Sequence, residues 1–395
     1  MNILFWLSIG LDRRTPSEHL LTAMIEALYK RGHTVHILQK DTGGQIKELY
    51  PKLQDLGVTT TKIEMSPVAH NNLVNRYVSD VEYVQKAKRW LKINGHTFDR
   101  VFLQSSNVAG FQMRALKSYV PQVPIIFNIQ DLFPENAVYS GKLKKSGAPY
   151  YLFSHLQKYA YKNASALITI SEDMKSEIVQ LGVDKDKIEV IYNWSYQDEP
   201  YDTSLSENRD IRKMLPHNVF NVVYAGNIGV MQNVEIIIET AKRCQDPGVV
   251  FHIFGDGVHK KKLEDEACGL SNVRFWPMQP VEKAPALYSC ADINVIPLAR
   301  NIYKTALPSK TATCLAANAP VIFCIGTDSQ FAKMVNSKTG CPIVDCDDSK
   351  SLLDMILKIK NKDLTCDTTD FFIKNMGISH NSMEYARIIE AGTIL

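Results

Sequence analysis

The chain has 395 residues, a formal net charge of +3, 45% hydrophobic residues and 22% charged residues. These values are ordinary for a globular protein and exclude a disordered chain, a collagen-like fibre and a small disulfide-rich scaffold. The length exceeds what one hydrophobic core usually serves, so we expect two domains. The small net charge argues against nucleic acid as a partner, and no apolar run approaches the roughly 20 residues that a membrane-spanning helix needs.

Strands and helices are expected to alternate through the first half of the chain. The apolar segment 3–9 predicts a strand, and apolar residues that recur with helical spacing from Leu20 to Leu28 predict a helix that ends at Gly32. Helical patterns separate the strands that follow, which are expected at 33–38, 100–104, 124–128, 165–170 and 188–191.

The pattern lapses after Asn193 and then resumes. The polar, acidic segment 195–217 predicts a linker with one short helix. Strands are expected again at 221–225, 249–254, 272–275, 293–296 and 320–323. The alternation predicts an α/β fold with two Rossmann-like, doubly wound domains that face a cleft. The expected boundaries are 1–195 for an N-terminal domain, 196–372 for a C-terminal domain, and 373–395 for a C-terminal segment that crosses back to the first domain.

Glycine-containing loops follow three predicted strands, at the sheet edge where ligands of such folds bind. Gly10 follows the first strand alone, which disfavours the G-x-G-x-x-G fingerprint of NAD or FAD sites. It serves either a tight turn or the close approach of a ligand phosphate. The loop 226–229 has two glycines before a predicted helix, where backbone N–H groups suit anionic oxygens. The Gly-Asp-Gly loop 255–257 resembles a hairpin turn, but after a parallel strand we expect it to enter a crossover.

The segment Leu307-Pro308-Ser309-Lys310-Thr311 precedes an apolar helical pattern. Pro308 suits a first helical turn, Ser309 can cap the helix, and free N–H groups there favour an anion. Lysine is usually a solvated surface charge. Because Lys310 lies between a strand end and a helix start, we expect it to meet a diphosphate instead.

Metal binding is not expected from the cysteines or histidines. All eight cysteines lie between Cys244 and Cys366 without a C-x-x-C pair, and several fall in apolar stretches. We interpret them as thiols of a protein from a reducing cytoplasm, and the scattered histidines show no His-Glu-x-x-His pattern.

Several of these segments, taken in order, resemble family 4 glycosyltransferases. The similarity is greatest to the bacterial surface-polysaccharide branch that includes fucosamine transferases. The resemblance implies a GT-B fold, an acceptor-binding N-terminal domain, a C-terminal domain that binds a nucleotide-sugar, and transfer with retention of configuration and without a metal. The segments that carry it are 130–135 (Gln-Asp-Leu-Phe-Pro-Glu), 170–174, 191–194, 226–229, 255–257, 272–275, 308–310 and 316–322.

The sequence also departs from the family pattern. The family usually has a glutamate for the donor ribose where this chain has Thr313, and a partner glutamate for the transferred sugar where it has Thr305. The basic residues that often follow the first glycine loop are replaced by Val230 and Gln232. A threonine hydroxyl offers one hydrogen bond where a carboxylate can grip both ribose hydroxyls.

We therefore expect a retaining, metal-independent glycosyltransferase that moves a sugar, an N-acetylated hexose from a UDP donor, to a lipid-linked saccharide. No cofactor is expected. The expected catalytic residues are Lys310, Asp131 and Glu135; Asp131 either orients or deprotonates the acceptor, or caps the following turn. The expected donor-binding residues are Gly10, Gly226, Asn227, Gly229, Gly255, Asp256, Gly257, Met278, Gln279, Pro308, Ser309, Lys310 and Thr313.

Two other functions remain open at this stage. One is a nucleotide-sugar 2-epimerase, which shares the two-domain architecture, and the other is a degenerate, non-catalytic binding subunit, favoured by the two threonines. The segment 142–162 mixes lysines with aromatic residues. It predicts either a helix packed on the sheet with a solvated lysine face, or peripheral contact with an anionic membrane at the cytoplasmic side.

Overall fold

The computed structural model describes residues 1–11, 18–43, 51–68 and 73–394. Its internal contacts divide the chain into two compact units, which are Met1–Tyr192 with Ser379–Leu395, and Asn193–Ile378. Each unit contains one sheet in which every recorded strand pair is parallel. In the described part of the chain no helix combines the length and the apolar character that crossing a bilayer requires.

The sheet of unit 1 has seven strands in the order β3-β2-β1-β4-β5-β6-β7. Central strands such as β5 are buried along their whole length, as expected for a parallel sheet covered on both faces. The strands are β1 Asn2–Trp6, β2 Thr34–Thr42, β3 Thr59–Met65, β4 Arg100–Gln104, β5 Ile125–Ile129, β6 Ala166–Thr169 and β7 Ile188–Val190. The helices are α1 Glu18–Lys30, α2 Pro51–Asp55, α3 Leu73–Asn94, α4 Ala109–Tyr119, α5 Glu135–Tyr139, α6 Ala148–Asn163 and α7 Glu172–Gln180.

The C-terminal helix α16 (Ile378–Ala391) packs on unit 1 although it comes last in the chain. Its Tyr385 hydroxyl donates at 2.9 Å to Oδ1 of Asn128, which lies near the carboxyl end of β5. Near the end of the helix, the Arg100 guanidinium donates to the Glu390 carbonyl, and the Glu390 carboxylate pairs with Arg31. The hydrogen bond from the Arg31 guanidinium holds the pKa of the Glu390 carboxyl below its ordinary value. These contacts make residues 379–394 part of the first unit.

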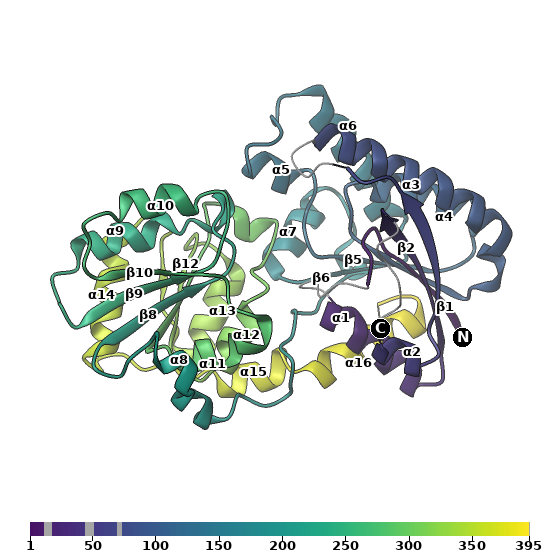
Figure 1. Cartoon of the computed structure of the whole chain (residues 1–395). Helices are drawn as coiled ribbons and strands as arrows, with labels where there is room; N and C mark the ends of the chain where they lie inside the picture. Colours follow the sequence, from purple (N-terminus) through teal and green to yellow (C-terminus); the bar gives the residue numbers. More distant parts are fainter. Residues whose placement is uncertain (12–17, 44–50, 69–72, 395) are drawn as a thin grey trace. The chain divides into compact units, whose positions relative to one another are not determined.

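The sheet of unit 2 has six strands in the order β10-β9-β8-β11-β12-β13. Its helices form two layers (Figure 1): α9, α10 and α14 share the core on one face, and α8 and α11 pack on the other. The strands are β8 Phe220–Ala225, β9 Val249–Phe254, β10 Val273–Trp276, β11 Ile293–Pro297, β12 Val321–Cys324 and β13 Ile343–Val344. The helices are α8 Arg209–Arg212, α9 Glu235–Arg243, α10 Lys260–Glu266, α11 Ala284–Ser289, α12 Thr311–Ala316, α13 Gln330–Thr339, α14 Ser349–Lys360 and α15 Thr369–Asn375.

The predicted α/β class is confirmed, and two strands were missed by the sequence analysis. The missed strands are β3 and β13, and both lie at sheet edges. The strand β3 contains three threonines, a lysine and a glutamate, so it lacks the apolar run of a buried strand. The strand β13 has only two residues, which is too short to produce a recognisable pattern.

Both sheets have the strand order in which ligands bind where the order reverses, beyond the carboxyl ends of the strands. In unit 1 this point lies between β1 and β4, and in unit 2 it lies between β8 and β11. The loops that follow these strands are therefore the first places to look for a site in each unit.

Candidate functional site

Two glycine loops of unit 2 pack against each other backbone to backbone. A Cβ atom on Gly255 would lie 1.9 Å from the carbonyl oxygen of Gly226, and one on Gly257 would lie 2.3 Å from that of Ile228. Gly255 and Gly257 also have φ near +150°, a conformation that other residues rarely adopt. These glycines are thus required by the packing of the two loops. The expected crossover after Gly257 is confirmed, because β9 continues through α10 into the parallel strand β10.

The N–H groups of these loops are only partly available to a ligand. Gly226 N–H donates to Phe254 O at 2.9 Å and Ile228 N–H donates to Asp256 O at 2.8 Å, so these two N–H groups already have acceptors within the protein. In the described part of the chain, the N–H groups of Asn227 and Gly229 have no recorded acceptor. These two donors are the ones that remain for an anion.

The Lys310 side chain lies beside the first glycine loop, at the point where the strand order reverses. Its ammonium donates to Ala225 O at 3.0 Å and lies 3.6 Å from the centroid of the Tyr224 ring, within the range of a cation–π contact. A Cβ atom on Gly226 would lie 3.1 Å from Lys310 Nζ, so glycine at 226 keeps the approach open.

The charge of Lys310 is poorly compensated by the protein. No recorded ion pair joins it to a carboxylate within the described residues. Burial lowers the pKa of Lys310 to about 7. Burial in turn raises the pKa of Cys314 to about 12, so this thiol stays neutral near pH 7. An anionic ligand would supply the partner that the ammonium lacks.

The local structure around Lys310 differs from the expected helix start. The helix α12 begins at Thr311 with Lys310 at its N-cap position, and no side chain caps it. Ser309 is exposed and Pro308 lies before the helix, so the expectation that Ser309 caps and Pro308 opens the first turn is wrong. The Thr311 N–H donates instead to Pro308 O at 3.0 Å, which closes a tight turn.

The two threonines that replace the family glutamates are both buried. Thr305 Oγ1 donates to Ile302 O at 3.1 Å. The Thr313 hydroxyl is hydrogen-bonded to Tyr201, a buried tyrosine that also contacts Ser195. Thr313 therefore contributes to packing between α12 and the segment before α8, which we did not expect.

Met278 and Gln279 follow β10, on the same edge of the sheet as the glycine loops. Met278 is 51% exposed, and the Gln279 side-chain amide donates to Pro277 O at 3.1 Å. Asp256 is exposed, and its carboxylate accepts from the Gly257 N–H at 2.8 Å. These side chains lie at the same edge of the sheet as the glycine loops.

Unit 1 has a small cavity at the carboxyl ends of β4 and β5. Its volume is about 80 Å³, which is room for several water molecules. Asp131 lies at its surface-exposed rim, and desolvation by the surrounding protein raises the pKa of this carboxyl to about 6. The cavity is lined by Ser105, Ser106, Asn107, Phe127, Asp131, Phe133, Asn136, Gln157 and Tyr161.

The polar groups of this cavity are held in place by hydrogen bonds. Buried Gln157 donates to Ser106 O at 2.8 Å, and Ser106 Oγ donates to the buried Gln112 side chain at 2.6 Å. Glu135 begins α5 and accepts from the Tyr150 hydroxyl at 3.1 Å. Burial, together with the Glu135 carboxylate, raises the pKa of Tyr150 to about 12. Glu135 is thus engaged by α6, whereas Asp131 is the carboxyl that borders the cavity.

Gly10 lies in the loop after β1, beside the point where the strand order of unit 1 reverses. The next residue, Leu11, donates its N–H to the buried Gln39 side chain at 2.8 Å. This bond fixes the loop on the sheet, which fits the reading of Gly10 as a turn residue.

Sequence reasoning missed Lys260 and most of the cavity in unit 1. Lys260 begins α10, and its ammonium donates to Gly255 O at 2.9 Å, so it is a second cation at the glycine loops. Its position directly after the Gly-Asp-Gly loop could have suggested it. The cavity depends on Gln157, which comes from a helix far along the chain, and no local pattern predicts that contact.

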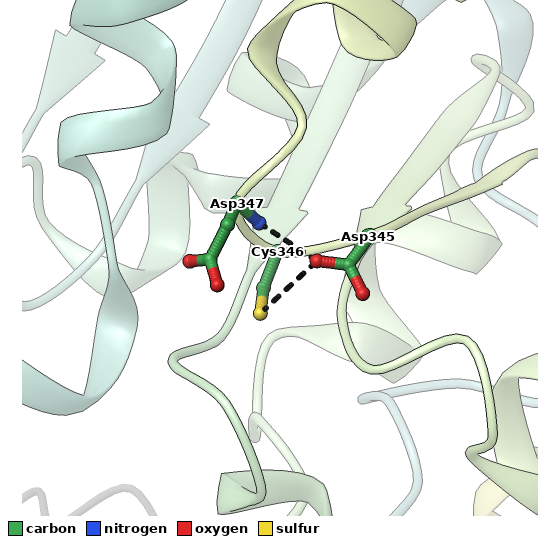
Figure 2. Close-up of side chains that lie close together, drawn as sticks. All are labelled: Asp345, Cys346 and Asp347. Atoms are coloured by element: carbon green, nitrogen blue, oxygen red, sulfur yellow. Dashed lines mark hydrogen bonds between the residues drawn. The ribbon is translucent and has the colours of Figure 1, made fainter.

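One cluster with metal-ligand residue types occurs in the described residues, at Asp345, Cys346 and Asp347 (Figure 2). Figure 2 shows the Asp345 carboxylate accepting from the Asp347 N–H, a bond of 3.1 Å. The Arg300 guanidinium pairs with both carboxylates, at 2.7 Å to Asp345 and 2.5 Å to Asp347. Because a cation already compensates these charges, the cluster is explained as an exposed ion-pair network.

Two family models match consecutive parts of the chain. The first, glycosyltransferase family 4, matches residues 17–194, and the second, glycosyl transferases group 1, matches residues 219–362. The chain belongs to glycosyltransferase family 4. The matched segments contain Asp131, the two glycine loops and Lys310, so the candidate residues of each unit lie in a region matched by a family model.

Two curated relatives are both named as glycosyltransferases. The chain is 27% identical over 203 residues to the putative colanic acid biosynthesis glycosyl transferase WcaI of Escherichia coli, which is 50% of each chain. It is 27% identical over 226 residues to the probable glycosyltransferase WbjE of Pseudomonas aeruginosa, 54% of this chain and 55% of WbjE. The chain thus spans about half the length of the curated relatives it matches.

Solved structures of low identity share the fold over the whole chain. Anabaena Alr3699/HepE, crystallised with UDP and glucose, has a TM-score of 0.72 at 15% identity, with 99% of this chain and 100% of that chain covered. The UDP-GlcNAc 2-epimerase of Neisseria meningitidis has a TM-score of 0.57 at 13% identity, with 99% coverage of this chain. The fold is GT-B, and because a 2-epimerase shares it, the fold alone does not separate transfer from epimerisation.

Proposed function

We propose that this family 4 member is a glycosyltransferase that moves a sugar from a nucleotide-sugar to a saccharide acceptor in surface-polysaccharide synthesis. The observation that carries the proposal is Lys310, a partly buried lysine with no recorded carboxylate partner, beside two backbone N–H groups with no recorded acceptor. A diphosphate would satisfy all three groups. The family membership and two relatives, a putative colanic acid biosynthesis glycosyl transferase and a probable glycosyltransferase, support the same reaction class.

The donor is proposed to bind unit 2 with its diphosphate against Lys310 and the N–H groups of Asn227 and Gly229. Lys260, whose ammonium donates to Gly255 O, adds a second positive charge at the packed loops. We propose UDP as the nucleotide, with its base and ribose toward Met278 and Gln279, and an N-acetylated hexose as the transferred sugar. The UDP complex of the structurally similar Anabaena protein supports UDP as the nucleotide.

The proposed chemistry needs charge stabilisation of the departing diphosphate and a partner for the incoming hydroxyl. Lys310 and the two N–H groups supply the first, so the reaction needs no metal for this step. Asp131, with its pKa raised to about 6, supplies the second by accepting a hydrogen bond or proton from the acceptor. We propose that the configuration at the anomeric carbon is retained, as the family resemblance implies.

A thermal-stability screen with nucleotide sugars tests the donor site. A ligand that binds only the folded state raises its melting temperature, and we expect UDP-linked sugars to do so. Lys310→Ala should abolish most of this rise. The matched control Lys338→Ala removes an exposed lysine from the last turn of α13, away from the glycine loops. This variant should keep the rise in melting temperature. An equal rise in both variants would remove Lys310 from the donor site.

A non-catalytic binding subunit is the second candidate, because Thr305 and Thr313 are buried where the family has glutamates. Calorimetric titration with UDP separates the two, since a degenerate domain should not bind it. A 2-epimerase would bind the donor but convert it without any acceptor, so release of UDP that depends on an added glycan distinguishes transfer from epimerisation.

We propose a lipid-linked acceptor and peripheral contact with an anionic membrane through the start of α6. Lys142, Lys144 and Lys145 are exposed in the segment before this helix. Tyr151 and Leu152, in its first turns, are 64% and 57% exposed. Lysines beside exposed apolar side chains suit an anionic bilayer surface, where each lysine contributes about 1 kcal/mol.

Vesicle binding tests the membrane contact. We expect the protein to bind vesicles with anionic lipid, with binding that weakens as salt rises. Replacing the three lysines before α6 with glutamine should reduce binding strongly. A control with the same charge change uses three exposed lysines elsewhere in unit 1, Lys92, Lys185 and Lys187. Equal binding to neutral and anionic vesicles would contradict the electrostatic part of the proposal.

A further inference from the structure

Unit 2 contains two free cysteines, Cys341 and Cys366, from segments that are separated in the chain by β13 and α14. Cys341 follows the end of α13 and is completely buried, and Cys366 precedes α15 and is partly exposed. Neither residue belongs to the glycine loops or to the cavity in unit 1.

The two segments run side by side with direct backbone contact. The Asp367 N–H donates to Thr339 O at 2.9 Å. A Cβ atom on Gly340 would lie 2.9 Å from the carbonyl oxygen of Thr365 and 4.0 Å from the Cα atom of Cys366. The Cys366 thiol also lies 3.6 Å from the carbonyl oxygen of Gly340, the residue before Cys341. This spacing places the two cysteines next to each other.

The backbone that holds Cys341 is fixed by its own hydrogen bonds. The Cys341 N–H donates to Thr339 Oγ1 at 3.1 Å, and this hydroxyl donates to Val335 O at 2.7 Å. Gly340 closes the end of α13 with φ of +72°. These bonds hold Cys341 in a fixed turn beside the segment that carries Cys366.

The thiols themselves interact. A hydrogen bond from the Cys366 thiol holds the pKa of Cys341 below its ordinary value, against the opposing effect of burial. The same contact, together with burial, raises the pKa of the Cys366 thiol. The arrangement places a thiol of lowered pKa next to a second thiol that can resolve its oxidised form, which are the two parts of a redox-sensitive pair.

We propose that Cys341 and Cys366 are a site of reversible oxidation, at which a peroxide converts the two thiols to an intramolecular disulfide. One sulfur attacks a peroxide oxygen, the O–O bond breaks, and a sulfenic acid forms as hydroxide or alkoxide leaves. The second sulfur then attacks the sulfenic sulfur, the S–O bond breaks, water leaves, and the S–S bond forms. The two thiols are oxidised and the peroxide is reduced to water and an alcohol, or to water alone from hydrogen peroxide.

The disulfide would close a loop that contains β13 and α14, and so restrict the unfolded chain. The oxidised form of unit 2 should therefore be more stable than the reduced form. This inference does not depend on the proposed glycosyl transfer, because the two cysteines belong neither to the glycine loops with Lys310 nor to the cavity of unit 1.

Peptide mapping of the folded chain tests the proposal. The protein is treated with hydrogen peroxide, free thiols are blocked with N-ethylmaleimide, and the unfolded chain is digested with trypsin. We expect a linked pair of peptides, 339–350 and 363–374, lighter by two hydrogen atoms than their sum and separated by dithiothreitol. Because the first peptide also contains Cys346, a Cys346→Ser variant must keep the link.

The functional readout is the melting temperature. Oxidation should raise it by roughly 5 °C or more in the wild type and in a Cys268→Ser control, which lacks only an exposed cysteine. Cys366→Ser, at a partly exposed position, should fold and lose both the link and the rise. Failure of the folded wild type to form the link, or an equal rise in Cys366→Ser, would overturn the proposal.

Discussion

Replacing Lys310 with methionine should change how nucleotide affinity depends on pH. Burial lowers the pKa of Lys310 to about 7, so its charge varies across the range in which most enzymes work. A diphosphate stabilises the protonated form, and the apparent affinity should therefore follow the protonated fraction of the free protein. Between pH 6 and pH 8 this fraction falls about tenfold for a group that titrates near pH 7.

Of Lys310 and the titratable side chains around it, only Lys310 is expected to change its charge between pH 6 and pH 8. Burial raises the pKa of Tyr224 and of Tyr288, and it raises the pKa of Cys314 to about 12. All three stay neutral between pH 6 and pH 8. The ratio of wild-type to Lys310→Met affinity for UDP, measured by calorimetry, should thus fall about tenfold from pH 6 to pH 8. Titration of UDP itself cancels in this ratio.

A pH-independent ratio would refute the reasoning, because it would mean that Lys310 keeps one charge state or does not meet the phosphates. The same pKa predicts the stability of the free protein. The folded pKa lies below the unfolded value, so the unfolded chain binds more protons between pH 7 and pH 10. In that window, the free energy of unfolding should rise with pH by up to about 1.4 kcal/mol per unit relative to Lys310→Met.

Three further outcomes are expected. Gly255→Ala should lower the free energy of unfolding by about 2–4 kcal/mol in urea titration, because its Cβ atom would meet a carbonyl oxygen at 1.9 Å. The control Gly269→Ala is also at positive φ but would have nothing within 4 Å of its Cβ atom, so it should lower the free energy of unfolding by only about 1 kcal/mol. Thr313→Glu should destabilise the fold instead of tightening UDP binding, since it places a carboxylate against buried Tyr201; tighter binding at unchanged stability would contradict this. Asp131→Asn should remove the limb of the pH–rate profile that rises through about pH 6, and a surviving limb would exclude Asp131 as the base.

The sequence predicts the interior of this fold well and its edges poorly. Strands such as β5 and β11 are buried along their whole length and mostly apolar, each with one asparagine, because both faces of the sheet are covered, so composition reveals them. The edge strands β3 and β13 pair on one side only and carry no such signal. Their existence depends on tertiary pairing, which a local pattern does not encode.

The sequence predicted which loops form the candidate site, but not which contacts the residues of these loops make. Strand ends and glycine patterns led to the right loops, yet the glycines at 255 and 257 are explained by loop–loop packing. Ser309 resembled a cap, but Lys310 occupies the N-cap position of α12. The lowered pKa of Lys310 depends on burial over Tyr224, which follows only from the folded arrangement of β8 and α12.

The most direct test of the proposed transfer is acceptor-dependent release of the nucleoside diphosphate. The purified chain is given the nucleotide sugar that stabilises it most, with and without membrane lipids from the organism that makes the protein. The account predicts that the lipid fraction stimulates release, that the sugar appears in the lipid, and that Lys310→Met lowers the rate by about 100-fold or more. Conversion of the donor to an isomer without any lipid, or release that Lys310→Met leaves unchanged, would contradict it.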